Sequence, residues 1–373
     1  TPFCQSQPLT WDGLSNRRTP RSSHNMSEPP TSYRIPHEPY LFLRSPIREP
    51  DTDIFCVRFS PDGGMIAAGC GDGCIKVYHS ASGRLKKTLT IGVSQKFPTT
   101  SLAFRPQSTE SGKMQNVLLA GNASGVVQHW HCDTGECLHQ LREDGNEIYA
   151  VEFSPDGRLF ATAGKDQAVR VYDEVTKQLL HTLRDGCPDI TSGHFNRVFS
   201  LKFHPTDPNL LMSAGWDNTI QIWDLRGDHS VRSIHGTHIC GDSVDIVGDT
   251  VLAGSWRPEK QLQTYDFHTT EMLKEIEWAP SDDGRREATL VYAARFGGDR
   301  NQYIAAGGSC GDEAKVFDTT TGALIGGVKL PGAIYSLDFA PSGRYVAFAG
   351  ANFGIEIADL AKKMPSKATK SEA

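Results

Sequence analysis

The segment GGSCG, from Gly307 to Gly311, is the first place where this sequence could carry catalysis. It matches the Gly-x-Ser-x-Gly pattern of hydrolases, with Ser309 as the nucleophile. A nucleophilic serine of that kind needs a strand, a sharp turn and then a helix. The corresponding segment ATAGKD elsewhere in the chain has the pattern of a strand-to-strand hairpin, and no helix is indicated after Ser309. We therefore expect a structural serine here.

Histidine and cysteine crowd into the segment HWHCDTGECLH, whose possible zinc ligands are His129, His131, Cys132, Cys137 and His139. Zinc needs four ligands that converge tetrahedrally. Strand alternation places His129 and His131 on one face and Cys132 on the other, with DTGE as a hairpin turn. Because this places the side chains on different faces, the sequence favours an outer hairpin without a metal.

The glycine cluster GCGDG, from Gly69 to Gly73, resembles a phosphate-binding loop. It lacks the Lys-Ser/Thr pair and the helix that would bind phosphate, so a tight turn with positive φ is the better interpretation. No His-Glu-x-x-His motif occurs, and no base can be paired with a nucleophile. We therefore expect no enzyme activity, no cofactor and no small-molecule substrate.

Composition narrows the class of protein further. The 373 residues include 36 Gly and 21 Pro, which does not suit a helix bundle, and carry a net charge of -6, which argues against a surface built to grip nucleic acid. No apolar run approaches the roughly 18 residues of a membrane span. The nine cysteines include no Cys-x-x-Cys pair, which favours reduced thiols. We expect a cytoplasmic protein without membrane or nucleic-acid partners, with nuclear or cytoskeletal placement left open.

Internal repeats organise the chain. Segments beginning at Asp53, Glu147 and Asn196 align, and each has the pattern of four short strands separated by turns, which predicts a four-stranded antiparallel meander. Four weaker copies fill the remaining sequence. The apolar anchors of the first strands recur about every 47 residues, close to the period of a propeller. These anchors are Phe59, Phe104, Phe153, Phe203, Ile246, Phe296 and Phe339.

The fourth repeat contains Gly193-His194 followed by Trp223-Asp224, and with these motifs the chain resembles the WD40-repeat family over about residues 40–361. The resemblance implies an all-β, seven-bladed β-propeller. It also implies a buried structural tetrad formed by His194, Ser213, Asp217 and Trp223. Most other repeats lack the Gly-His pair, and Tyr or Phe often replaces Trp.

Propellers of this family close their ring by borrowing a strand from the other terminus. The last repeat stops at its third strand, IEIADL, and the apolar segment YLFLRS at about 40–45 precedes the first repeat. We expect this segment to form the outer strand of the last blade. The domain organisation is then a disordered basic Ser/Pro-rich tail (1–32), the propeller (33–361) and a disordered Lys-rich tail (362–373).

One position of the repeat carries a candidate binding surface. The residue four positions before each anchor is aromatic in five of seven repeats, and the resemblance implies that it lies near the narrow-face mouth of the central channel. These residues are Phe55, Thr100, Tyr149, Phe199, Asp242, Tyr292 and Tyr335. Such rings either anchor a partner side chain, including an Arg or Lys through cation–π attraction of about 0.5–2 kcal/mol, or pack between blades. Residues near the adjoining turns, expected on the same face, are Lys165, Trp216, Trp256 and Arg257.

We therefore expect a non-enzymatic scaffold that binds peptides or domains on the narrow (top) face of a propeller and works within a multiprotein complex. Two alternatives stay open. One is a structural subunit of a cytoskeletal, ciliary or ubiquitin-ligase assembly, and the other is a chromatin-associated module.

Overall fold

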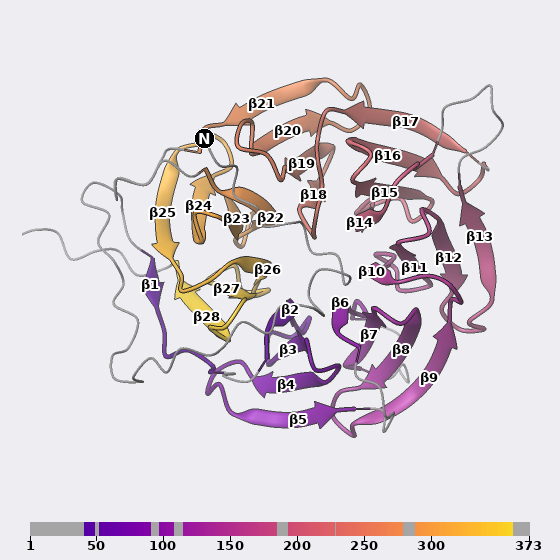
Figure 1. Ribbon diagram of the computed structural model, residues 1–373, viewed down its shortest axis with the longest axis horizontal. Helices are drawn as coiled ribbons and strands as arrows, with labels where there is room; N and C mark the ends of the chain where they lie inside the picture. The colour runs from indigo at the N-terminus through magenta and orange to yellow at the C-terminus, as the bar shows by residue number, and fades with distance from the viewer. Residues whose placement is uncertain are drawn as a thin grey trace, which may run out of the picture.

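The computed structural model describes residues 41–48, 52–90, 97–107, 115–184, 193–227, 229–278 and 288–360. The regular elements of these residues are strands, which form seven four-stranded antiparallel sheets around a common axis (Figure 1). This arrangement confirms the predicted all-β propeller with seven blades. The expected tails at 1–32 and 362–373 lie outside the described residues.

Each blade is a meander whose first strand lies nearest the axis. The first three blades consist of β2 (Ile54–Phe59), β3 (Met65–Cys70), β4 (Ile75–His79) and β5 (Leu85–Leu89); β6 (Thr99–Phe104), β7 (Val117–Asn122), β8 (Val126–His131) and β9 (Glu136–Arg142); and β10 (Ile148–Phe153), β11 (Leu159–Gly164), β12 (Val169–Asp173) and β13 (Leu179–Leu183). The next two consist of β14 (Val198–Phe203), β15 (Leu210–Gly215), β16 (Thr219–Asp224) and β17 (Ser230–His235); and β18 (Val244–Val247), β19 (Thr250–Gly254), β20 (Leu262–Asp266) and β21 (Met272–Ile276). The last two consist of β22 (Leu290–Gly297), β23 (Tyr303–Ser309), β24 (Glu313–Asp318) and β25 (Leu324–Lys329); and β26 (Ile334–Phe339), β27 (Tyr345–Gly350), β28 (Ile355–Asp359) and β1 (Phe42–Leu43).

The second strand of a blade is rich in small residues because neighbouring backbones approach it closely. Strand β11 reads LFATAG, and its five residues from Phe160 onward are buried. A Cβ added at Gly164 would lie 1.8 Å from the carbonyl oxygen of Glu147, so only glycine fits there. The alternation of small and large residues therefore reflects the crowding near the axis.

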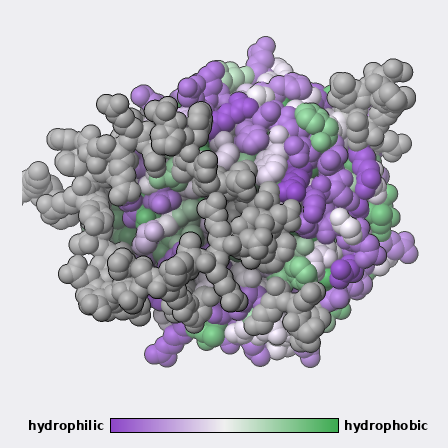
Figure 2. All heavy atoms as spheres, viewed as in Figure 1, coloured by the Kyte–Doolittle hydropathy of each residue, from purple (hydrophilic) through white to green (hydrophobic). Residues whose placement is uncertain are grey.

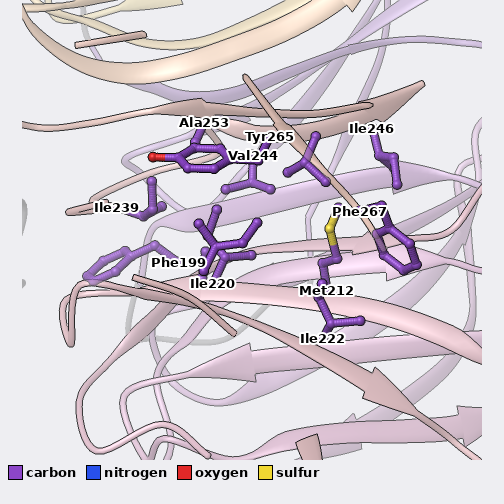
Figure 3. Close-up of a cluster of buried hydrophobic side chains, with 13 residues drawn as sticks. Phe199, Met212, Ile220, Ile222, Ile239, Val244, Ile246, Ala253, Tyr265 and Phe267 are labelled. Atoms are coloured by element: carbon purple, nitrogen blue, oxygen red, sulfur yellow. The ribbon is translucent and has the colours of Figure 1, made fainter. Parts of the chain in front are cut away.

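The hydrophobic core is divided among the interfaces between blades. The described residues contain seven buried clusters, and each combines side chains of two neighbouring blades. Figure 3 shows the cluster between the fourth and fifth blades, where Met212 and Ile222 face Ile246 and Phe267. On the outside, Figure 2 shows mostly hydrophilic side chains among the described residues, with hydrophobic ones scattered between them. Each blade is thus stabilised by its neighbours on both sides.

The N-terminal segment closes the ring, as predicted. Strand β1 pairs antiparallel with β28, and the backbone nitrogen of Arg44 donates to the carbonyl oxygen of Ile357 at 2.8 Å. Ile47 continues the pairing through a bridge to Ile355 and is 6% exposed. The edge of β28 is therefore covered, which removes an unpaired strand edge.

A buried carboxylate lies beside this closing segment. The side chain of Glu356 on β28 is 3% exposed, and its Oε1 lies 3.3 Å from Nη1 of Arg48. Burial raises the pKa of Glu356 from 4.5 to about 7, although Arg48 acts in the opposite direction. Because the folded pKa lies above the unfolded value, the protonated form favours the fold, and that stability is lost as the pH rises through 7.

We expect Glu356→Gln to flatten this pH dependence. The variant should match the wild type near pH 4.5 and unfold at a higher temperature at pH 8, because the amide carries no charge to bury. Thermal unfolding between pH 4.5 and 8 measures the difference, with Glu271→Gln at an exposed position as the matched control. A variant that is less stable than the wild type at pH 8 would contradict the prediction.

Candidate functional site

A bulge at the inner strand directs the candidate side chains toward the axis. In six blades the first strand skips one residue in its pairing with the second strand. The skipped residues are Phe55, Thr100, Tyr149, Phe199, Tyr292 and Tyr335. In the fifth blade the equivalent residue, Asp242, lies just before β18. A bulge re-aims its side chain out of the ladder, and all seven predicted positions line one pocket that is partly open to solvent.

Aromatic rings follow one another around this pocket. The distances between successive ring centroids range from 4.7 to 6.4 Å. They are 4.7 Å for Tyr149–Phe199, 5.1 Å for Phe199–Trp216, 6.4 Å for Trp216–His238, 6.2 Å for His238–Trp256, 6.3 Å for Trp256–Tyr292, 5.8 Å for Tyr292–Tyr335 and 5.5 Å for Tyr335–Phe55. We call these eight residues the aromatic arc. The arc is interrupted at the second blade, where Pro98, Thr100 and Ala123 line the pocket.

The members of the aromatic arc differ in how deeply they are buried. Phe199 and Tyr292 are only 5% and 3% exposed, and Phe199 belongs to the core cluster between the fourth and fifth blades. The other six members are half-buried and keep part of their surface open. Packing between blades is therefore shown for Phe199, whereas a binding role stays a prediction for the six partly exposed members.

The floor of the pocket carries a charge cluster. Asp242 Oδ2 accepts from Nη2 of Arg58 and, at 2.5 Å, from Nη2 of Arg295. Burial alone would raise the pKa of Asp242, but Arg295 and Arg58 outweigh it and hold that pKa well below its usual range. The carboxylate is ionised and its charge is matched by two guanidinium groups from other blades.

The charged residues predicted on the rim are engaged within the chain. Lys165 Nζ lies 2.6 Å from Oε1 of Glu147, and Oε2 of Glu147 accepts from the hydroxyl of Tyr149. Arg257 donates to the carbonyl oxygen of Gly236 and, at 3.0 Å, to Oδ1 of Asn218. None of the four residues predicted near the adjoining turns lines the pocket itself; these are Lys165, Trp216, Trp256 and Arg257.

A second pattern in the repeats marks residues at the floor of the pocket. The residue one position before each first-strand anchor is charged in six of seven repeats. These residues are Arg58, Ala103, Glu152, Lys202, Asp245, Arg295 and Asp338. Two of them are the arginines that bind Asp242. His238, by contrast, enters the arc from a connecting segment outside the repeat pattern, and no sequence signal pointed to it.

The residues of the predicted tetrad form one buried chain of hydrogen bonds. His194 Nδ1 lies 2.6 Å from Oδ2 of Asp217, and its Nε2 lies 2.6 Å from the hydroxyl oxygen of Ser213. Trp223 Nε1 donates to the same hydroxyl oxygen at 2.7 Å. Burial would raise the pKa of Asp217, but His194 and Thr219 outweigh it and lower that pKa. These hydrogen bonds connect the second and third strands of the fourth blade to the segment that precedes the blade.

Two other blades contain a buried carboxylate in their polar network. In the third blade Glu143 Oε1 accepts from the hydroxyl groups of Thr162, at 2.5 Å, and Tyr172, at 2.9 Å. Arg170 donates to the other oxygen of Glu143 at 2.8 Å. In the sixth blade Glu313 Oε1 accepts from Trp278 at 2.6 Å and Thr289 at 2.8 Å. The third blade, which lacks the Gly-His pair, thus still contains a hydrogen-bonded polar network, whereas Glu313 Oε2 in the sixth blade has no hydrogen-bond partner among the described residues.

The remaining motifs form no reaction centre. Ser309 ends β23 and is followed by a turn and strand β24 rather than a helix. His129 is buried and lies 3.0 Å from Oε2 of Glu174, and burial lowers its pKa. Within the described ranges no three side chains of His, Cys, Asp or Glu gather closely enough to hold a metal ion. None of the described segments is a helix long and apolar enough to cross a membrane.

Comparison with known proteins agrees with this geometry. The repeat described as "WD domain, G-beta repeat" matches residues 43–79, 135–173 and 185–224. The chain is 28% identical to the Periodic tryptophan protein 2 homolog of Dictyostelium discoideum over 178 residues, which is 47% of this chain and 18% of that protein. It is 22% identical to Protein tipD of the same organism over 305 residues (80% and 38%) and 27% identical to Coronin-7 of Bos taurus over 213 residues (54% and 21%). The chain thus spans less than half of each of these relatives.

The tetrad geometry predicts a large loss of stability for Ser213→Ala. The variant leaves His194 Nε2 and Trp223 Nε1 buried without a partner, which should lower the free energy of unfolding by about 2–4 kcal/mol. Urea denaturation measures the loss. Ser233→Ala on the outer strand β17, where the hydroxyl contacts only His235 at 3.3 Å, is the matched control and should be nearly neutral. Equal losses in the two variants would contradict the assignment.

Proposed function

Because this chain is a WD40-repeat β-propeller, we propose that it acts as a non-enzymatic protein-interaction scaffold whose partners bind at the aromatic arc. Scaffolds of this kind work by rigid display: a closed ring holds side chains from several blades at fixed relative positions. Binding then costs little ordering entropy on the side of the propeller. The partners are peptides or protein domains, and the protein works as a subunit of a multiprotein complex.

The observation that carries the proposal is a series of eight neighbouring aromatic rings, five of which line one pocket. Aromatic side chains supply large contact area with few rotatable bonds, and they dominate the energetics of protein interfaces. Six of the eight keep part of their surface accessible. Clusters of partly exposed apolar side chains of this kind mark interaction sites on soluble proteins.

The names of the relatives indicate no common partner, so the proposal takes only the scaffold role from the family. For the compartment we propose the cytoplasm. The support is chemical: all seven cysteines in the described part of the chain are free thiols, which fits a reducing compartment.

We expect Phe55→Ala combined with Tyr335→Ala to abolish partner binding while the protein still unfolds cooperatively. These two rings stack at 5.5 Å, are both half-buried, and belong to none of the buried clusters between blades. Phe199 is a poorer position for this test because it is part of the core. Quantitative mass spectrometry of proteins captured from cell extract by the wild type and by the variant gives the measurement.

The matched control is Leu179→Ala combined with Leu180→Ala on the outer strand β13, where both side chains are about half exposed. This control should retain the proteins that the wild type captures. If the Phe55/Tyr335 variant captures the same proteins while the Leu179/Leu180 variant loses them, the interaction surface is the outer rim, and the proposal for the arc is wrong.

A further inference from the structure

The pocket within the arc presents no unmatched charge to a guest. Its charged lining residues are Arg58 and Asp242, which bind each other. Asp242 is bound a second time by Arg295 from the sixth blade, and Arg295 Nε lies 3.7 Å from Oδ1 of Asp338. The charges on the floor of the pocket are therefore paired before any partner arrives.

Four uncharged polar side chains of the lining are also engaged within the chain. The hydroxyl of Thr100 donates to the carbonyl oxygen of Ile148. The hydroxyl oxygens of Ser101 and Ser336 each accept from a backbone nitrogen of the next blade at 3.1 Å. Cys240 Sγ accepts from Nε1 of Trp216 at 2.9 Å. What remains for a guest is chiefly carbon surface.

The faces of several rings in the arc are already covered. Phe199 lies between Tyr149, stacked at 4.7 Å with an interplanar angle of 9°, and Trp216 at 5.1 Å. The guanidinium group of Arg197 lies 5.3 Å from the ring centre of Trp216. A cation is attracted to the face of a ring, whereas ring edges carry partial positive charge. Stacking therefore leaves few open ring faces that could attract a cationic side chain at this side of the pocket.

We propose that this pocket takes an uncharged aromatic side chain of the partner protein, and that it discriminates against cationic side chains. The inference rests on the proposed function and adds the class of side chain that the partner inserts. A buried guanidinium or ammonium group would lose its hydration and find no free counter-ion on the lining. A neutral ring exchanges water for carbon surface and packs against the edges and open faces of the arc.

Small probes of each class test the assignment without any knowledge of the partner. We expect 3-methylindole to bind the purified chain, and n-butylguanidinium to bind at least about tenfold more weakly, which corresponds to about 1.4 kcal/mol. Ligand-observed and protein-observed NMR titrations measure both affinities. Tighter binding of n-butylguanidinium, or no binding of 3-methylindole, would overturn the proposal.

A variant locates the binding in this pocket. Thr100→Tyr places a ring at the one inner-strand bulge position that lacks a ring or a charge, and the equivalent bulge in other blades already accommodates Tyr or Phe. It should weaken 3-methylindole binding at least about fivefold by filling the gap in the arc. Thr182→Tyr, at an exposed position of β13, should leave the affinity unchanged. Equal affinities of the two variants would place the probe elsewhere and overturn the proposal.

The two proposals fail separately. If the Phe55/Tyr335 variant loses its partners but n-butylguanidinium is the better probe, the arc is the interaction surface and only the class of guest is wrong. If 3-methylindole binds at the pocket but the captured proteins are unchanged in that variant, the preference of the pocket for an uncharged ring stands, but the partner does not insert a side chain there and the scaffold surface lies elsewhere.

Discussion

Closure of the ring by the segment from Phe42 to Ile47 is the constraint on which the other features depend. Each core cluster is shared between two blades, so no blade can bury its apolar face alone. The pairing of β1 with β28 covers the last open edge and joins Leu43 to the cluster between the sixth and seventh blades. With the ring closed, the seven interfaces support one another in a cycle, and the inner strands are held at fixed distances across the axis.

That fixed geometry converts a local irregularity into the pocket that we propose as a binding surface. A single skipped residue in the inner strand is a small feature, but six bulges around one axis direct six side chains into the same pocket. Side chains from the first, fifth and sixth blades meet on its floor, where Asp242 binds Arg58 and Arg295. The charges are paired inside the protein, and five aromatic rings form much of the remaining lining of the pocket.

The polar networks show how one structural task is met by different residues. The fourth blade uses His194, Ser213 and Trp223, whereas the third uses Glu143 with Thr162 and Tyr172. In both, a buried acceptor ties the second and third strands to the preceding segment, and every link is a hydrogen bond that burial makes costly to break. This explains why the repeats retain their shape where the Gly-His and Trp-Asp motifs are missing.

The sequence by itself determined the repeated meander, the number of blades, the closing strand and the positions that face the axis. The first two follow from periodicity, because each repeat encodes its strands and turns locally. The closing strand and the axis-facing positions follow from the resemblance to the WD40-repeat family. Only the tertiary structure decided which rings contact one another, that Phe199 and Tyr292 are buried while Phe55 and Tyr335 stay half-open, and that His238 completes the arc. The pairing of Arg58 with Asp242, 184 residues apart, was likewise settled only there. The physical reason is distance along the chain: side chains on different blades meet only after the whole ring has closed, and no local pattern records which of them will touch.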